Sequence, residues 1–266
     1  MASKDGRVAA RDNELRVLRA LHRFGWLRTR DVAALVWLTW AKADGVAVAP
    51  SLRPAVPTAA GLPTAQRTLG RLNDRRWVLR ARAPDGATIY ALAEAGARFL
   101  QQSGIAAESG KDLLRPQSGG YYRHRCIANA VAIGAIVDGL RASTEREIAQ
   151  GRWFGGTAGV AGKRPDVLIR DSATAWWVEV ERSRKNARDY RQLLSWLDVA
   201  LADARIGAEA RLLNSLRWGK IAFICTPAFE LKLRADLRDR GWSRQDIDQW
   251  IHFSTSLYKL EDIVFF

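Results

Sequence analysis

Acidic side chains recur between Arg164 and Lys185, a stretch that reads RPDVLIRDSATAWWVEVERSRK. Glu179 and Glu181 lie two residues apart in a strand-like run, so both carboxylates point to the same face of that strand. Asp166 opens the preceding run, and a hairpin would bring it to the same place. Converging carboxylates repel one another and need protons or a cation. Since hard divalent cations prefer oxygen ligands, the sequence predicts Mg²⁺ or Mn²⁺ at Asp166, Glu179 and Glu181.

Two strands and a short polar turn must position these carboxylates. The strands are expected at residues 167–170 and 176–181. An alternative is that the second strand lies at a sheet edge, with its two glutamates forming a solvated face. The run Trp176-Trp177-Val178 is more apolar than edge strands usually are. The residues that follow are expected to open a cationic helix, through Arg182, Arg184 and Lys185.

These residues resemble the motif of the PD-(D/E)XK nucleases, which share the restriction-endonuclease-like core. Pro165-Asp166 matches the PD pair, and Glu179-Val180-Glu181 matches the second half, with Glu181 where lysine is usual. The resemblance implies catalysis by Asp166, Glu179 and Glu181. Lys185 or Arg182 would supply the positive charge of the lysine that Glu181 replaces in the motif. Some restriction enzymes of this superfamily carry E-x-E and still cut DNA. The exchange at Glu181 nevertheless leaves an inactive core as an alternative.

The composition indicates a folded protein with a polyanionic partner. The chain has 42 Lys and Arg against 28 Asp and Glu, a formal net charge of +14, and a sequence pI near 10.5. This excess favours nucleic acid over a membrane, and residues 1–104 hold 17 basic against 8 acidic residues. Cys126 and Cys225 lack metal-binding spacing, and neither a long apolar run nor a signal peptide is evident. We therefore expect a cytoplasmic protein with no membrane partner.

The N-terminal part has the element order of a winged helix-turn-helix. Helices are expected at residues 13–24, 30–40 and 64–77, with a Pro-rich loop at 41–63. A hairpin should follow, with strands at Val78–Arg82 and Thr88–Leu92 around an Asp-Gly turn. The third helix would enter the major groove of double-stranded DNA, and the hairpin would be the wing. The predicted DNA-binding residues are Gln66, Arg67, Arg71, Arg75, Arg76, Arg80 and Arg82. The alternative is a winged helix used only for packing or dimerisation, with these arginines as a solvated face.

The remaining chain predicts a second domain, and with it a mixed α+β fold class. After a closing helix at 93–102, the Gly- and Ser-rich residues 103–120 are expected to link domain 1–102 to domain 121–266. The second domain should run as a helix at 121–140, strands at 144–149 and 153–154, the central hairpin, a helix at 186–206 and a strand at 220–226. Further helices are expected at 230–240 and from Ser243, with extended runs at 251–254 and 263–266. His124, on the first of these helices, is interpreted as structural. This is the αβββαβ order of the restriction-endonuclease-like core.

A winged helix joined to this core, a His-bearing helix, the RPD triplet and the ExE-x-S-x-K stretch together resemble the replication-relaxation family over residues 13–226. That family includes plasmid mobilisation proteins and MobC-class relaxases. The resemblance implies a nicking endonuclease or relaxase that acts at an origin of transfer. Its partners would be double-stranded DNA, at that origin or an operator-like site, and other relaxosome or coupling proteins. The sequence also leaves open that the protein forms a homodimer, because winged-helix proteins often dimerise.

Two other functions stay open, and one class is excluded. The core could be inactive, which would leave a relaxosome accessory protein or a DNA-binding transcriptional regulator. Alternatively, the chain could be a defence nuclease that cuts many DNAs. Relaxases with a histidine cluster need three histidine ligands, whereas His22, His124 and His252 are scattered along this chain.

Overall fold

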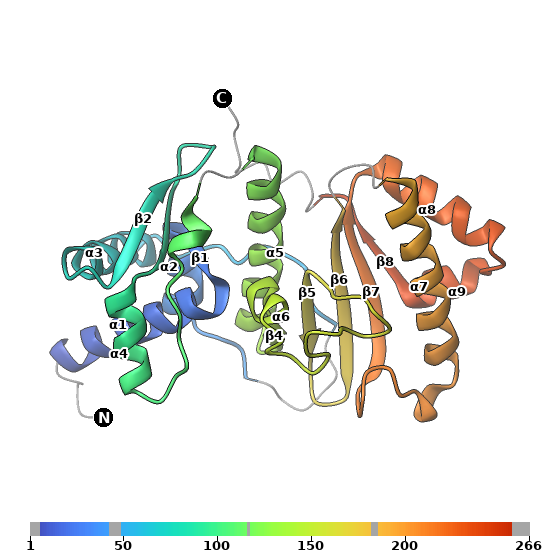
Figure 1. Ribbon diagram of the computed structural model, residues 1–266, viewed down its shortest axis with the longest axis horizontal. Coiled ribbons are helices and arrows are strands. Elements are labelled where there is room, and N and C mark those ends of the chain that lie inside the picture. The colour runs from blue at the N-terminus through green and yellow to red at the C-terminus, as the bar shows by residue number, and fades with distance from the viewer. Residues whose placement is uncertain (1–5, 43–48, 116–117, 182–185, 257–266) are drawn as a thin grey trace. The chain divides into compact units, whose positions relative to one another are not determined.

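The computed structural model describes residues 6–42, 49–115, 118–181 and 186–256. It contains α-helices and two β-sheets, which confirms the expected α+β class (Figure 1). The described chain forms two compact units, the first from residues 6–40 and 55–123 and the second from residues 41–54 and 124–256. The chain therefore passes from the first unit to the second inside a helix, three residues beyond the linker expected at 103–120.

The first unit combines helices with a three-stranded antiparallel sheet. Its elements are α1 (Gly6–Phe24), β1 (Trp26–Arg28), α2 (Thr29–Trp37), α3 (Gly61–Asp74), β2 (Val78–Arg82), β3 (Thr88–Leu92), α4 (Glu94–Gln102) and the 3-10 helix η1 (Lys111–Leu114). Strand β3 lies in the middle and pairs with both β1 and β2. The β2–β3 hairpin has the predicted bounds because Asp85 accepts the Ala87 N–H at 3.0 Å and Gly86 takes a positive φ of 79°.

Helix bounds in this unit differ from the prediction by three residues or more at four places. Helix α1 begins at Gly6 rather than Asn13, because the Arg and Ala residues before Asn13 are good helix formers. Helix α2 ends at Trp37 instead of residue 40, and α3 spans Gly61–Asp74 instead of residues 64–77. Strand β1 was not predicted, since three residues are too short to show a periodicity.

The segment predicted as an insertion loop, residues 41–63, has no helix or strand in its described part before Gly61. Its first portion packs on α5 (Gly119–Val137) and the turn that follows it. The Ala41 N–H donates to the Val137 carbonyl at 2.8 Å, and the Ser51 hydroxyl donates to Asp138 at 2.6 Å. A Cβ atom on Gly134 would lie 2.3 Å from the Arg53 carbonyl oxygen, so only glycine allows this close approach.

The second unit is built on a five-stranded mixed sheet. Its elements after α5 are β4 (Arg141–Ser143), α6 (Glu145–Ala149), β5 (Val167–Arg170), β6 (Thr174–Glu181), α7 (Ala187–Arg205), the 3-10 helix η2 (Gly207–Glu209), β7 (Arg217–Cys225), α8 (Pro227–Asp239), α9 (Arg244–Trp250) and β8 (Ile251–Ser254). The strand order is β4-β5-β6-β7-β8, with antiparallel pairing from β4 to β6 and parallel pairing from β6 to β8. Figure 1 shows α5 on one side of this sheet and α7 and α8 on the other.

The predicted strand at residues 144–149 was wrong. Strand β4 ends at Ser143, and Thr144 instead caps helix α6. The Thr144 hydroxyl accepts the Glu147 N–H at 3.2 Å, and the Glu147 carboxylate accepts the Thr144 N–H at 3.0 Å. This reciprocal pair satisfies two N–H groups that a helix start would otherwise leave without partners. Residues 153–154 lie in a turn rather than in a strand. The extended run expected at 263–266 lies outside the described residues.

A tryptophan cluster fixes the face of β6 that points toward α7. The Trp177 side chain is fully buried, and its ring lies 4.6 Å from the ring of Trp196 on α7 and 6.3 Å from that of Trp218 on β7. Large aromatic side chains dominate core energetics because each buries about 150–250 Å². Trp177 therefore sets the register and orientation of the residues that follow it on β6.

Candidate functional site

Asp166 and Glu179 lie next to each other where β5 begins beside β6. Asp166 immediately precedes β5, and its N–H donates to the Val178 carbonyl at 3.0 Å. One of its carboxylate oxygens, Oδ2, accepts the Val180 N–H at 2.7 Å. The antiparallel register pairs Val167 with Val178, which puts Asp166 beside Glu179. The hairpin thus brings together two of the three carboxylates predicted to share a site.

Glu179 and Glu181 alternate with Val178 and Val180 along β6, so they share the face that carries Trp177. Strand β6 lies between β5 and β7, and the exposed fractions of Glu179 and Glu181 are only 4% and 5%. The alternative of a solvated edge strand was therefore wrong. Both carboxylates are enclosed at the centre of the sheet, where a charge needs compensation.

Lys163 supplies a positive charge to Glu179. Its Nζ atom lies 2.8 Å from Glu179 Oε2, while the Trp177 indole N–H donates to Glu179 Oε1 at 2.6 Å. A small turn holds Lys163 in place, because its backbone and that of Val160 exchange two hydrogen bonds. The Lys163 ammonium also lies 5.8 Å from the ring centre of Trp196, within reach of a cation–π interaction.

His124 supplies a positive charge to Asp166. Its Nε2 atom lies 3.2 Å from Asp166 Oδ1 and 4.0 Å from Glu145 Oε2. Glu145 in turn forms an ion pair with Arg125 at 2.9 Å. The sequence predicted only a structural role for His124, and it gave no role to Lys163. The nearest signal for Lys163 was its position three residues before Asp166.

The charges of this site shift the pKa values of its members in opposite directions. Burial raises the pKa of Glu179 to about 7, the charges of Asp166 and Glu181 act the same way, and Lys163 opposes them. Burial alone would lower the pKa of His124, but its hydrogen bond to Asp166 and the nearby carboxylates raise it to about 9. The pKa of Asp166 is lowered, since His124 and the Val180 N–H outweigh its burial. A carboxyl group that titrates near neutral pH beside a lysine has the properties of a general acid or base.

The predicted metal ligands fit a hard cation by donor type, because all are carboxylates. In the described part of the chain, however, no three His, Cys, Asp or Glu side chains are arranged as a metal-binding group. His124 and Lys163 provide the positive charge that the sequence assigned to a metal. A divalent ion on Glu179 would have to replace Lys163 as its partner. Lys185 and Arg182, the predicted sources of the missing charge, lie outside the described residues.

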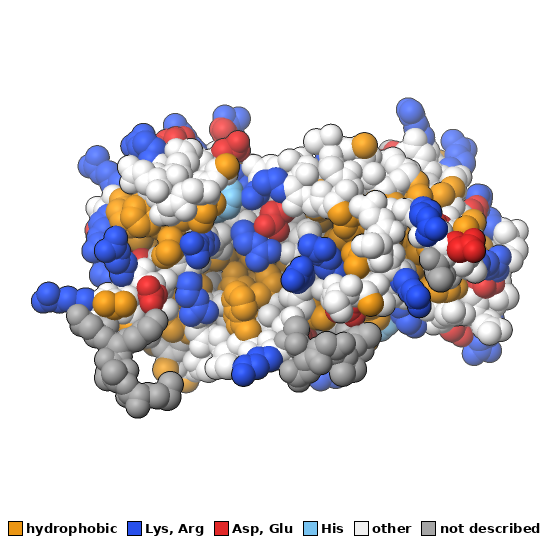
Figure 2. Space-filling view, turned by 90° about the horizontal axis from the view of Figure 1, so that it is seen from below, with side chains coloured by type: hydrophobic (Ala, Val, Ile, Leu, Met, Phe, Trp, Pro, Cys, Tyr) orange, Lys and Arg blue, Asp and Glu red, His pale blue; other side chains and the backbone are white. Residues whose placement is uncertain are grey.

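The predicted DNA-binding side chains are all exposed, and they fall into two sets. Arg71 and Arg75 form ion pairs with Glu14 of α1, at 3.3 Å and 2.8 Å. The second set lies on α3, after it, or on the outer face of β2, and consists of Gln66, Arg67, Arg76, Arg80 and Arg82. Figure 2 shows a face on which Lys and Arg side chains are more frequent than Asp and Glu, in line with the net charge of +14.

Comparisons with protein-family models, with curated proteins and with solved structures found no match to this chain. Among the described helices, none has the length and apolar character needed to cross a membrane.

Proposed function

We propose that this chain is a DNA-binding plasmid mobilisation protein of the replication-relaxation type, which nicks DNA at an origin of transfer. The observation that carries the proposal is the pairing of Asp166, just before β5, with the buried Glu179 on β6, and Lys163 at 2.8 Å from Glu179. In the proposal, these side chains would act as the acid, acid and lysine of a PD-(D/E)XK site, with the lysine drawn from a different place in the sequence.

The connectivity of the second unit supports the same proposal. One helix, α5, precedes three strands that pair antiparallel, and α7 then leads to β7, which lies parallel to β6. With α6 as a short addition after β4, this order is compatible with the αβββαβ order expected for a restriction-endonuclease-like core. In such a core the carboxylates would lie where β5 begins and near the end of β6, which is where Asp166 and Glu179 are found.

Asp166 and Glu179 would hold Mg²⁺ or Mn²⁺, with Glu181 as a third carboxylate beside them. The ion would polarise the scissile phosphate and lower the pKa of a bound water. Lys163 would then be released from Glu179 to stabilise the negative charge that develops on the phosphate. His124 would keep Asp166 ionised and oriented through the contact at 3.2 Å.

The first unit would provide DNA binding as a winged helix. Helix α3 would enter the major groove, where exposed Gln66 and Arg67 would reach base edges. Arg80 and Arg82 on β2 would contact phosphates from the wing. Arg71 and Arg75 are already paired with Glu14 of α1. Their main role would be to hold α3 in position, rather than to contact DNA bases. Partners would then be double-stranded DNA and other relaxosome or coupling proteins.

A second candidate is an accessory protein or transcriptional regulator without catalysis. One observation favours it: each of the four carboxylate oxygens of Asp166 and Glu179 lies within 3.2 Å of a protein donor. A site that is satisfied in this way is stable without a metal. In that case the carboxylates stabilise the core, and the first unit alone carries the function.

The test is nicking of a supercoiled plasmid that carries the DNA flanking this protein's own gene, with Mg²⁺ or Mn²⁺. We expect open circles with the wild type and none with Asp166→Ala or Glu179→Ala. Removing Lys163 by substitution with Met should slow nicking about 100-fold, and Lys163→Arg should restore part of it. Asp171→Asn is the matched control, because an amide oxygen can still accept the two turn N–H groups that Asp171 binds.

The outcomes separate the two candidates. Wild-type nicking by Asp166→Ala would refute the assignment of the site. DNA binding without nicking, unchanged in all variants and without a carboxylate-dependent Mn²⁺ site, would establish the accessory protein or regulator.

A further inference from the structure

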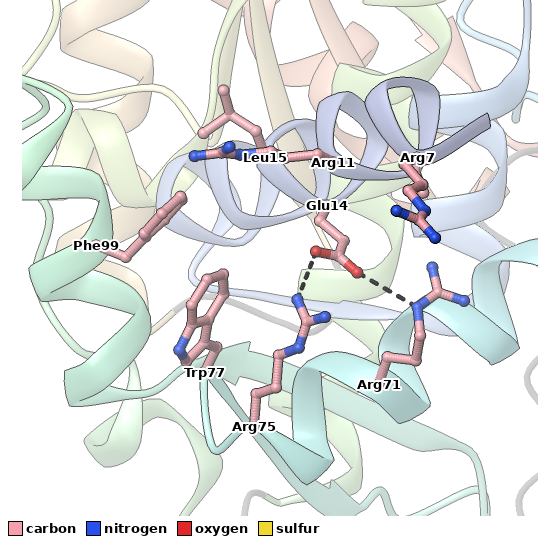
Figure 3. A pocket seen from close by; sticks show the side chains of 9 residues that line it. Arg7, Arg11, Glu14, Leu15, Arg71, Arg75, Trp77 and Phe99 are labelled. Atoms are coloured by element: carbon pink, nitrogen blue, oxygen red, sulfur yellow. Dashed lines mark hydrogen bonds and ion pairs between the residues drawn. The ribbon is translucent and has the colours of Figure 1, made fainter. Parts of the chain in front are cut away.

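A hollow of about 370 Å³ lies within the first unit, between α1, α3 and α4. Figure 3 shows the side chains that line it, from these helices and from Trp77, which precedes β2. Its volume falls in the range of small-molecule sites, about 300–1,000 Å³. None of the residues proposed above for catalysis belongs to the first unit, so this hollow is a separate feature.

Positive charge dominates the hollow. Arg7 and Arg11 reach it from α1, and Arg71 and Arg75 reach it from α3. Among the described lining residues, the only carboxylate is that of Glu14, whose oxygens accept from Arg71 Nε at 3.3 Å and Arg75 Nη1 at 2.8 Å. Glu14 is thus paired with two of the four arginines that line the hollow. The described lining carries four guanidinium groups and one carboxylate, so its charge is positive.

One wall of the hollow is a pair of stacked aromatic rings. The rings of Trp77 and Phe99 lie 4.5 Å apart with an interplanar angle of 24°, and both side chains are partly exposed. The Arg75 guanidinium lies 5.7 Å from the Trp77 ring centre. A flat aromatic ligand can stack on such a surface, and base–aromatic stacking is worth about 1–3 kcal/mol. The hollow therefore offers stacking and anion binding side by side.

We propose that this hollow binds a mononucleotide. Its base would stack on the outer face of the Trp77–Phe99 pair, and its phosphate would accept hydrogen bonds from Arg11, Arg71 and Arg75. Arginine suits a phosphate because its planar fork donates two parallel hydrogen bonds. The phosphate would also take Arg71 and Arg75 away from Glu14, so occupancy would change how α3 is held on α1. The proposal stands without the nicking function, since it uses side chains of the first unit alone.

Titration calorimetry of the full chain tests this proposal, with AMP, adenosine and inorganic phosphate as separate ligands. We expect one AMP per chain, and binding at least tenfold weaker for adenosine and for phosphate. Arg11→Gln and Arg75→Gln should each weaken AMP binding about tenfold, the usual loss of one charged hydrogen bond. Arg19→Gln is the matched control, because Arg19 is exposed on the same helix but does not line the hollow.

A further variant tests the stacking surface. Trp77→Leu should weaken AMP binding and leave phosphate binding unchanged. The absence of binding by AMP, GMP, CMP and TMP at about 1 mM would overturn the proposal. Equal affinities for AMP and phosphate, with no effect of Trp77→Leu, would also overturn it, because the hollow would then be a plain anion site. Arg11→Gln leaves the packed interior untouched, so its result does not depend on how Trp77→Leu folds.

Discussion

The ion pair between His124 and Asp166 makes the stability of the second unit depend on pH in the alkaline range. The pKa of His124 is raised from 6.5 to about 9 in the folded protein. A raised pKa means that the stabilisation is fully present below about pH 6.5 and is lost as the pH rises through about 9. Combining the titration of His124 in the folded state with its titration in the unfolded state gives a loss of about 2 kcal/mol in the free energy of unfolding between about pH 7.5 and 9.5. This range lies above the pKa of Glu179, about 7, whose own titration therefore contributes little.

Urea unfolding in EDTA, followed by tryptophan emission at both pH values, measures this loss. The wild type should lose about 2 kcal/mol between them, and His124→Gln should lose correspondingly less. His252→Gln is the matched control, because burial and the charge of Lys220 lower the pKa of His252, so it titrates below this range. An equal loss in the wild type and His124→Gln would refute the reasoning, since His124 would then carry no proton at pH 7.5.

Three further substitutions test local contacts through the free energy of unfolding. Thr144→Ala removes the cap of α6 and should cost about 1 kcal/mol, with a matching loss of hydrogen-exchange protection in that helix. Asp31→Asn breaks the buried ion pair with Arg28 and should cost about 3–5 kcal/mol in chemical denaturation, whereas a cost below 1 would contradict burial of the pair. The Asp203 carboxylate accepts hydrogen bonds from one indole N–H and two backbone N–H groups. Asp203→Asn replaces one accepting oxygen with an NH₂ group, which cannot accept, and should lower the free energy of unfolding by about 1–3 kcal/mol in the same measurement.

The elements that the sequence predicted well are those with a local cause. The β2–β3 hairpin follows from an Asp-Gly turn between two alternating runs, and its bounds were confirmed. Helix α9 follows from Ser243, whose hydroxyl accepts the Asp246 N–H at 3.0 Å. The prediction of a strand at residues 144–149 was wrong for a related reason. The run was assigned to a strand, whereas the spacing of Thr144 and Glu147 is that of a capping box.

The candidate site was only partly predictable. Asp166 and Glu179 could be placed together because both lie on one hairpin, and hairpin register is a local property. The contacts of His124 with Asp166 and of Lys163 with Glu179 depend on how α5 and a turn pack against the sheet. No periodicity or spacing specifies such packing. The positive charge that the sequence assigned to a metal and to Lys185 is therefore provided, in the described residues, by two side chains without a recognisable motif.

The packing of residues 41–42 and 49–54 on α5 and its following turn limits how the gene can be divided. The chain passes between its two units at residues 40–41, 54–55 and 123–124, rather than once through a linker. A fragment that ended at residue 102 would keep Ser51 and lose its partner Asp138. Recombination at a single point cannot exchange one unit for that of another protein without separating this segment from the helix it covers. The two units are thus expected to be inherited together, and a working chimera would have to carry residues 41–54 with the second unit.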